Sequence, residues 1–184
     1  DLYHFGSATA FMGGNLKDTY FKLKEYAKSN NKIISFDANY RESLFGNNKE
    51  EFIKCCKEFI VDSNIVKLSE EEAKLISGIE DIKEASQYIV NLGCENLMVT
   101  LGKEGTLLSN REKQILIKTK EVKMKDATGA GDAFIGAVIA QILNEPGKSM
   151  EKIVEMANLV GGITTTKLGA LESIPTWDEV FAYN

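Results

Sequence analysis

Two aspartates separated by five residues frame the stretch of the sequence best suited to chemistry. The segment KDATGAGDAFIGA (125–137) places Asp126 and Asp132 on either side of Gly129, Ala130 and Gly131. Because these three residues carry little or no side chain, their backbone N–H groups can approach a ligand closely. The apolar residues that follow predict a helix, whose start has unpaired N–H donors and a partial positive charge. The pattern therefore predicts an anion site, with phosphate as the obvious ligand.

Asp132 falls in the first turn of this expected helix, where the macrodipole favours its ionised form. It could then accept a proton from a hydroxyl, and an acid beside a phosphate is useful when the phosphate is transferred to an alcohol. A plainer interpretation stays open: Asp126 or Thr128 caps the helix, the glycines allow close packing, and Asp132 is an ordinary first-turn acid. The spacing alone does not decide, because the P-loop and G-x-G-x-x-G patterns are both absent.

Composition narrows the class of protein. The 184 residues carry a net charge of −5, which argues against a large basic surface for nucleic acid or anionic lipid. No apolar run approaches the roughly 20 residues that span a membrane. Cys55 and Cys56 fall on the apolar face of an expected helix, and free thiols suit a reducing cytoplasm. His4 is the single histidine of the chain, and we expect it to have a structural role. The chain opens inside a strand-like run without Met, so we expect a fragment that lacks its front.

Strand-like and helix-like segments alternate along the chain, which predicts a three-layer, Rossmann-like α/β fold. The sheet is expected to be mostly parallel with helices on both faces, so ligand sites should lie beyond the carboxyl ends of its strands. Strands are expected at 2–6, 32–37, 64–68 and 96–101, with a hairpin over 105–110 and 113–119. Helices are expected at 15–30, 49–61, 69–77, 81–92, 130–144, 149–167 and 176–182.

DATGAGDAF (126–134) closely resembles the signature of the ribokinase-like (PfkB) family of carbohydrate kinases. Other segments agree with the family in order, and together they cover nearly the whole chain: HFGSATAF, FDANYRESLF, VKLSEEEAKLISG, VTLGKEGTLL and TTTKLGALESIP. The likeness is greatest to bacterial fructokinases, then to 2-keto-3-deoxygluconate kinases. It implies one C-terminal catalytic and nucleotide-binding part over 1–184, with no separate second domain. The early strands and the small β lid of the family would be missing.

The resemblance implies a divided site around the two aspartates. Asp132 would take the proton from the primary hydroxyl of the sugar, and the N–H groups of Gly129, Ala130 and Gly131 would form an anion hole. Thr128 would lie close to the phosphates. A monovalent cation, K⁺, would be held by Asp126, the carbonyl groups of Thr164, Lys167 and Gly169, and the hydroxyl of Ser173.

The ATP side of the site is implied by two further segments. VTLGKEG would cradle ATP, with Thr100, Gly102 and Gly105 near the ribose and phosphates, although a plain strand-to-hairpin turn is the alternative. Asn158 would face the adenine, and its alternative is an exposed helix residue.

The sequence leaves two interpretations open for Glu72 and two for Arg41. The family usually has N-x-x-E where this chain has SEEE, so Glu72 would hold Mg²⁺ through water, but Ser69 and Glu72 also form a capping-box pattern. Arg41 could meet phosphate or substrate, or pair with Glu42 or Asp37 on the surface. Asp37 and Asn39 are expected to shape the loop that carries it.

The resemblance therefore implies an ATP-dependent sugar kinase of the cytoplasm, most similar to a fructokinase, that uses ATP, Mg²⁺ and K⁺. Ketodeoxygluconate kinase and nucleoside kinase are the alternatives within the family, and a non-catalytic nucleotide-binding module is the alternative outside it. The expected partners are a small sugar and ATP, with no nucleic acid and no membrane. A homodimer of the full-length protein stays open, and residues 1–184 alone are expected to be inactive.

Overall fold

A six-stranded sheet organises the computed structural model, which describes residues 1–183. The strands lie in chain order: β1 (Leu2–Gly6), β2 (Ile33–Asp37), β3 (Ile65–Ser69), β4 (Asn96–Thr100), β5 (Thr106–Ser109) and β6 (Gln114–Ile117). β1 pairs with β2, and β2 with β3, in parallel. The register sets Gly6 beside Asp37, and Asp37 beside Lys67. The α/β class and the parallel start of the sheet are thus confirmed.

The chain forms two compact units. Unit 1 comprises Asp1–Val99 and Leu107–Ile115; unit 2 comprises Thr100–Thr106 and the chain from Leu116 onward. Unit 1 holds α1 (Gly14–Ser29), α2 (Glu42–Phe45), α3 (Lys49–Ile60), α4 (Glu70–Ser77) and α5 (Ile82–Leu92). Unit 2 holds α6 (Ala130–Asn144), α7 (Met150–Thr164) and α8 (Trp177–Ala182). Short 3-10 turns occupy Ala10–Met12, Gly46–Asn48, Gly102–Glu104 and Leu171–Ser173. Across the described residues, no helix has the length and apolar character needed to cross a bilayer.

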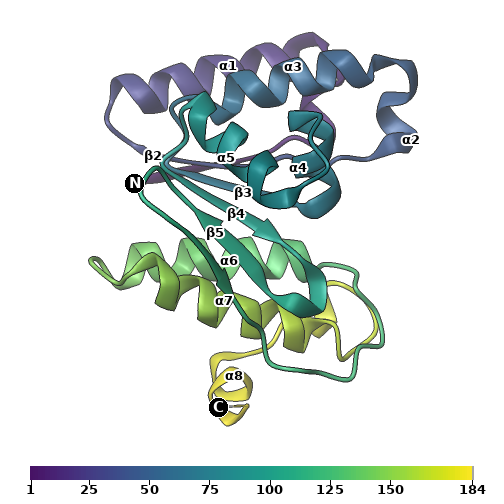
Figure 1. Ribbon diagram of the computed structural model, residues 1–184, viewed down its shortest axis with the longest axis vertical. Helices are drawn as coiled ribbons and strands as arrows, with labels where there is room; N and C mark the ends of the chain where they lie inside the picture. Colours follow the sequence, from purple (N-terminus) through teal and green to yellow (C-terminus); the bar gives the residue numbers. More distant parts are fainter. Residues whose placement is uncertain (184) are drawn as a thin grey trace. The chain divides into compact units, whose positions relative to one another are not determined.

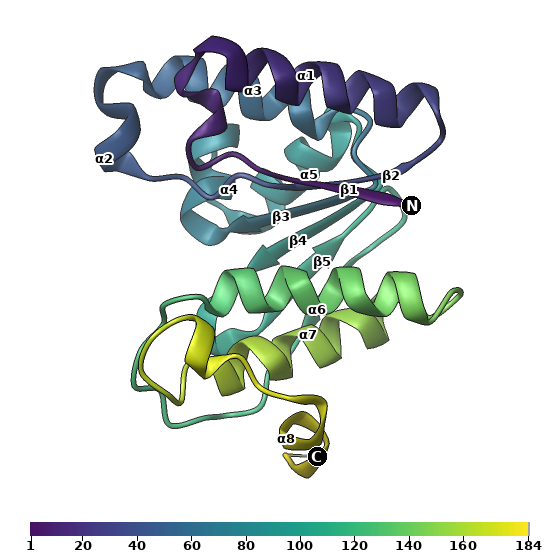
Figure 2. The same ribbon diagram turned by 180° about the vertical axis from the view of Figure 1, so that it is seen from behind.

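Aromatic side chains fill the core of unit 1. In Figures 1 and 2, α1 and α3 run side by side over the first strands. Phe59 of α3 lies at the centre, with its ring centroid 4.9 Å from Phe21 of α1, 5.3 Å from Phe36 of β2 and 5.2 Å from Phe11. Edge-on and tilted ring contacts of this kind add stability beyond the buried area alone. Cys55 and Cys56 are buried on the same helix, as their spacing predicted.

Three helices begin at side-chain caps, namely α4, α5 and α8. Ser69 and Glu72 complete a capping box at α4, Thr176 and Glu179 complete another at α8, and Asp81 caps α5. One expected boundary was wrong. The helix predicted to reach residue 167 ends at Thr164, because the hydroxyls of Thr165 and Thr166 donate to the Gly162 and Ile163 carbonyls and compete with further helical bonds.

Unit 2 is built on the packing of α6 against α7, and small residues set how closely the helices approach. A Cβ atom on Gly161 of α7 would lie 3.2 Å from the Ala130 carbonyl oxygen, at the first residue of α6. Gln141 is fully buried, and its amide nitrogen donates to the Ala137 and Ile153 carbonyls at 3.0 and 3.1 Å. The start of α6 is therefore fixed by α7, which matters because that start carries the candidate chemistry.

Candidate active site

Asp126 fixes the turn that leads into α6. One carboxylate oxygen accepts the Thr128 N–H at 2.9 Å and the Thr128 hydroxyl at 2.6 Å, and the other accepts the Gly169 N–H at 3.0 Å. The Thr128 bonds, with that of Gly169, hold the pKa of the Asp126 carboxyl below its ordinary value of 3.8. The first acid of the pair is therefore a charged anchor that joins two loops of unit 2.

Gly129 is required at its position by its backbone. It precedes α6 with φ +79°, in the left-handed region that residues with a Cβ atom avoid. A Cβ atom there would also lie 3.2 Å from the Cβ of Ala170. The Ala130 N–H donates to the Ala127 carbonyl at 3.2 Å, so it is engaged in the turn. The N–H groups of Gly131 and Asp132 lie in the first turn of α6, where no intrahelical acceptor is available.

Asp132 is exposed in the first turn of α6. Its position beside first-turn N–H groups is the one that the sequence predicted. An exposed carboxylate and free N–H donors on one helix start can bind an anion and accept a proton at the same place. Its role as a base stays a prediction at this point.

The residues expected to hold a monovalent cation are partly brought together. The Ser173 hydroxyl lies 2.5 Å from the Gly169 carbonyl oxygen, and Gly169 is bonded through its N–H to Asp126. Thr164 is fully buried at the end of α7. The ammonium of Lys167 pairs with Glu179 at 2.7 Å. The group of Lys167 that was predicted to bind the cation is its backbone carbonyl. One carboxylate with carbonyl and hydroxyl oxygens nearby is a donor set that suits a hard monovalent cation.

The segment expected near ATP is held by close backbone packing. Gly105 has φ +105°, and a Cβ atom on it would lie 2.1 Å from the Ile117 carbonyl oxygen, which no side chain could accommodate. Gly102 also has a left-handed backbone, but a Cβ atom there would meet open space. Leu101 N–H donates to the Gly105 carbonyl at 2.8 Å across this turn, which follows Thr100 at the end of β4. Gly105 is thus explained by packing, whether or not a nucleotide binds beside it.

Asn158 of α7 is buried and fully used inside unit 2, so the exposed-residue alternative was wrong. Its amide nitrogen donates to the Ile117 carbonyl at 2.8 Å, and its amide oxygen accepts the Thr106 hydroxyl at 2.6 Å. The Thr119 hydroxyl donates to its backbone carbonyl at 3.3 Å. Asn158 therefore ties α7 to the backbone around β5 and β6, and direct contact with adenine stays a prediction.

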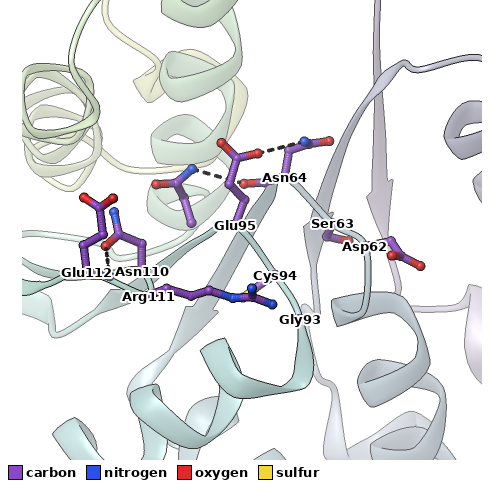
Figure 3. Close-up of a pocket in the computed structure, with 10 residues that line it drawn as sticks. Asp62, Ser63, Asn64, Gly93, Cys94, Glu95, Asn110, Arg111 and Glu112 are labelled. Atoms are coloured by element: carbon purple, nitrogen blue, oxygen red, sulfur yellow. Dashed lines mark hydrogen bonds between the residues drawn. The ribbon is translucent and has the colours of Figure 1, made fainter.

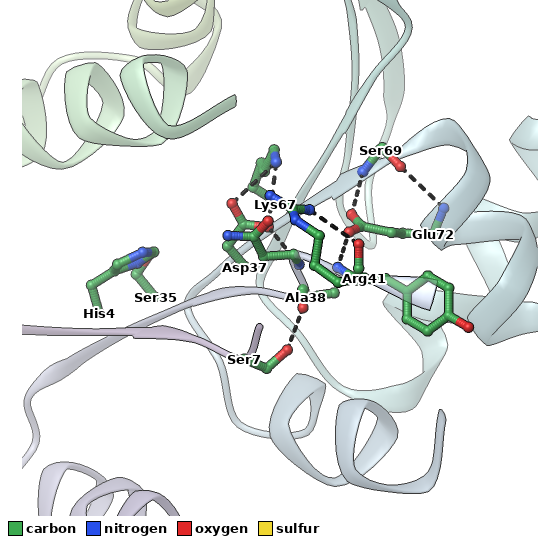
Figure 4. A network of polar contacts seen from close by, with 11 residues as sticks. His4, Ser7, Ser35, Asp37, Ala38, Arg41, Lys67, Ser69 and Glu72 are labelled. Atoms are coloured by element: carbon green, nitrogen blue, oxygen red, sulfur yellow. Dashed lines mark hydrogen bonds and ion pairs between the residues drawn. The ribbon is translucent and has the colours of Figure 1, made fainter. Parts of the chain in front are cut away.

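In unit 1, the loop after β2 is held by two buried carboxylates (Figure 4). Asp37, at the end of β2, accepts the Asn39 N–H at 3.1 Å. Glu72, in the first turn of α4, accepts the Tyr40 N–H at 2.6 Å and the Ser69 N–H at 2.7 Å. The ammonium of Lys67 of β3 contacts both oxygens of Asp37, at 3.1 and 3.3 Å. The sequence prediction that Asp37 and Asn39 shape this loop is confirmed.

Arg41 follows this loop and is exposed. Its guanidinium donates to the Tyr40 carbonyl at 3.0 Å. The ion pairs formed within residues 1–183 give it no carboxylate partner, so the expected alternative of a surface pair with Glu42 or Asp37 is not what the structure has. A guanidinium without a carboxylate remains available to an anionic ligand.

The fit of Glu72 to Mg²⁺ is poor for direct ligation. Each of its oxygens already accepts a short N–H bond, and the side chain is 7% exposed. Burial raises the pKa of the Glu72 carboxyl, while Lys67 opposes that rise. No group of three or more His, Cys, Asp or Glu side chains suited to a metal occurs among the residues that the structure covers. The capping role is thus the one observed, and a water-mediated Mg²⁺ contact stays a prediction.

A polar pocket of about 460 Å³ lies elsewhere in unit 1 (Figure 3). It is lined by the segments before β3 and β4 and by the turn between β5 and β6, including Asn64, Glu95 and Arg111. Asn64 and Glu95 precede the amino ends of β3 and β4, whereas Asp37 and Ser69 lie at the carboxyl ends of β2 and β3. None of the predicted site residues lines this pocket.

The chain is similar to known proteins along nearly its whole length. The pfkB family carbohydrate kinases match residues 1–177. Fructokinase-1 of Oryza sativa subsp. japonica is 32% identical over 97% of this chain and 57% of its own length. A double-mutant fructokinase from Vibrio cholerae O395, in fructose, ADP and potassium ion bound form, superposes with a TM-score of 0.93 at 28% identity, over 100% of this chain and 60% of its own. An uncharacterised sugar kinase from Pyrococcus horikoshii in complex with ATP superposes with a TM-score of 0.82 at 33% identity, over 100% of this chain and 57% of its own. The chain thus spans less than two thirds of the length of these relatives.

Two residues of the site region were missed by sequence reasoning. Lys67 was hidden in the apolar strand segment IVKLS, where a lysine in a buried strand is itself the signal. Gly161 was hidden in the helix segment LVGGIT, where a glycine inside a helix signals a close approach. In both cases the partner lies far away in the sequence, so only the fold could identify it.

Proposed function

Because the chain belongs to the pfkB family of carbohydrate kinases, we propose that the natural protein transfers the γ-phosphoryl group of ATP to the primary hydroxyl of a sugar. Fructose is the proposed acceptor, supported by the relatives that are fructokinases, one of them in fructose-bound form. The observation that carries the proposal is the turn over 126–132, with Asp126 anchoring it and Asp132 exposed at the helix start.

The proposed reaction divides the work between the carboxylate and the helix start. Asp132 accepts the proton of the sugar hydroxyl as the hydroxyl oxygen forms its bond to the γ-phosphorus. The bond from that phosphorus to the bridging oxygen of ATP breaks, and ADP leaves. In the proposed anion hole, the N–H groups of Gly129 and Gly131 stabilise the charge on the transferred group. The Ala130 N–H would join them only by leaving the Ala127 carbonyl. Negative charge develops on the transferred group in the transition state. Backbone N–H groups already in place bind that charge more strongly than the charge of the ground state, which speeds the reaction.

The remaining predicted residues supply binding in this proposal. Thr128 lies by the phosphates, the segment from Thr100 to Gly105 lies along the nucleotide, and Arg41 meets phosphate or sugar. K⁺ would be held by the oxygens around Asp126, Gly169 and Ser173, and it would supply fixed positive charge beside the anion hole. This is supported by the contacts among those residues and by the potassium-bound relative. Mg²⁺ would accompany ATP.

We further propose that the two units together form the catalytic and nucleotide-binding part of a cytoplasmic enzyme. Since the chain spans 57% of the rice fructokinase, residues 1–184 alone are expected to phosphorylate nothing. The test of the function therefore uses the natural protein at its full length.

The decisive measurement is sugar-dependent ADP release with a panel of fructose, ketodeoxygluconate, ribose and adenosine. We expect fructose to give the highest kcat/KM. Removing the base with Asp132→Asn should lower kcat by about 10²–10⁴-fold, the usual worth of a general base, while ATP binding by calorimetry persists. Near-normal turnover of Asp132→Asn would end the assignment of the base. Nucleotide binding without any sugar-dependent turnover would favour the non-catalytic module instead.

A further inference from the structure

Lys67 is a buried lysine that the proposed reaction does not use. It is the third residue of β3, it is 7% exposed, and the parallel register sets it directly beside Asp37 of β2. Moving an ammonium and a carboxylate out of water is expensive, and the attraction between them often only offsets that cost. A buried ion pair of this kind is therefore weak evidence for a stabilising role. The presence of Lys67 and Asp37 at this position needs another explanation.

The location of the pair is informative because Asp37, together with Glu72, also binds the backbone of the loop after β2. Asp37 is 2% exposed and accepts the Asn39 N–H, while the buried Glu72 accepts the Tyr40 N–H (Figure 4). Two successive backbone donors are thus held by two buried carboxylates. Two carboxylates in one buried region repel each other. The Lys67 ammonium pairs with Asp37 at 3.1 Å, and its positive charge also opposes the rise that burial gives to the pKa of Glu72.

The loop itself is in a conformation that needs support. Asn39 has φ +44°, in the left-handed region that a non-glycine residue enters at a cost. The ring of Tyr40 is fixed as well, with its centroid 4.8 Å from that of Phe52 and 5.9 Å from that of Phe45. The backbone and the ring of the loop are therefore both restrained immediately before the exposed Arg41.

We propose that Lys67, acting through Asp37 and Glu72, is a positioning residue that fixes the loop over 38–41 and so presents the Arg41 guanidinium to the anionic ligand in one orientation. The role of Arg41 in this inference rests on the proposed kinase function. The immobilisation of the loop does not, because it is a property of the unliganded fold.

The first experiment measures the loop without substrate. In the full-length protein, Lys67→Met should speed amide hydrogen exchange at Asn39 and Tyr40 by about tenfold or more, since local opening becomes easier. Lys28→Met is the matched control, because Lys28 forms an exposed ion pair with Asp62 in the same unit, and it should leave those amides unchanged. If Lys67→Met does not fold, the neutral pair Asp37→Asn with Lys67→Met should restore folding and still show faster exchange at Tyr40. Wild-type exchange at Tyr40 in the folded variant would overturn the proposal.

The second experiment tests whether Lys67 acts through Arg41. Lys67→Met should lower kcat/KM in the wild-type background and have little further effect in an Arg41→Ala background, because coupled residues give non-additive losses. Fully additive losses would show that Lys67 does not act through Arg41 and would overturn the proposal. Absence of sugar-dependent turnover in the wild-type protein would instead refute the proposed function. The exchange experiment would then still test whether Lys67 immobilises the loop.

Discussion

The loop after β2 (38–41) and the turn before α6 (126–129) both hold backbone in a left-handed conformation next to residues with candidate chemistry, yet they are fixed by different forces. The first relies on buried charges: Lys67 and two carboxylates hold an asparagine at φ +44°. The second relies on a partly exposed carboxylate, Asp126, and on a glycine at φ +79°.

The two segments are therefore expected to be sensitive to different kinds of substitution. Buried charges are sensitive to loss of a partner, because an unpaired buried charge or donor costs far more than the pair contributes. A glycine turn is sensitive to added atoms, because a Cβ atom meets both backbone strain and neighbouring residues. Substitutions in the two segments should therefore differ in what they damage.

Removing the acid of the loop should destabilise unit 1 most. Glu72→Ala leaves the Tyr40 and Ser69 N–H groups without their buried acceptor, so the free energy of unfolding should fall by about 3 kcal/mol. The matched control is Glu179→Ala, which removes the acid of the exposed capping box of α8 and should lower the free energy of unfolding much less, because water can replace the lost acceptor. Equal losses in urea denaturation would break the contrast between buried and exposed acids.

Adding one methyl group to the turn should damage activity more than stability. Gly129→Ala forces alanine into a left-handed backbone and against Ala170, and a small displacement of the anion hole should lower kcat by about 10–100-fold. Gly136→Ala lies in the same helix, with open space for a Cβ atom, and should stabilise the protein by about 0.5–1 kcal/mol. Unchanged kcat in Gly129→Ala would show that the turn is not the phosphate site.

The cation site should give a smaller effect. Turnover should be several-fold higher in K⁺ than in tetramethylammonium at equal ionic strength, since the oxygens around Asp126 would hold only the smaller ion. Asp126→Asn should remove most of this difference. Turnover that is indifferent to the cation in the wild-type protein would contradict the site.

The smallest effect concerns the charge of Asp126. Its pKa is held below the ordinary value of 3.8, first by the Thr128 bonds and then by the Gly169 N–H. A lowered pKa means that the ionised form is favoured by the fold, so this contribution to stability is present above pH 3.8 and is lost as the pH falls through the folded-state pKa. Carboxyl ¹³C shifts followed against pH should show a midpoint below 3.8, and Thr128→Val should raise it.

Much of the fold could be predicted from the sequence because its signals are local. The alternation of strands and helices, the two capping boxes and the buried cysteines depend on residues within a few positions of each other. The sequence offered Asp126 or Thr128 as the cap of α6, but the N-cap is Gly129 and has no side-chain cap bond. The bond of Asp126 to Gly169 joins distant segments instead. The Lys67 pair, the approach of Gly161 to Ala130 and the bonds of Asn158 to Ile117 join distant segments. No local pattern could have identified those partners.

The burial of Lys67 has a consequence for chemical labelling. Amine-reactive reagents modify lysines that solvent can reach, and the side chain of Lys67 is 9% exposed while that of Lys28 is 50% exposed. In the folded protein Lys67 should acquire label far more slowly than Lys28, and its labelling rate should follow the opening of the region around it. The labelling rate of Lys67, measured by mass spectrometry of the unsubstituted protein, would therefore report how often the loop over 38–41 opens locally.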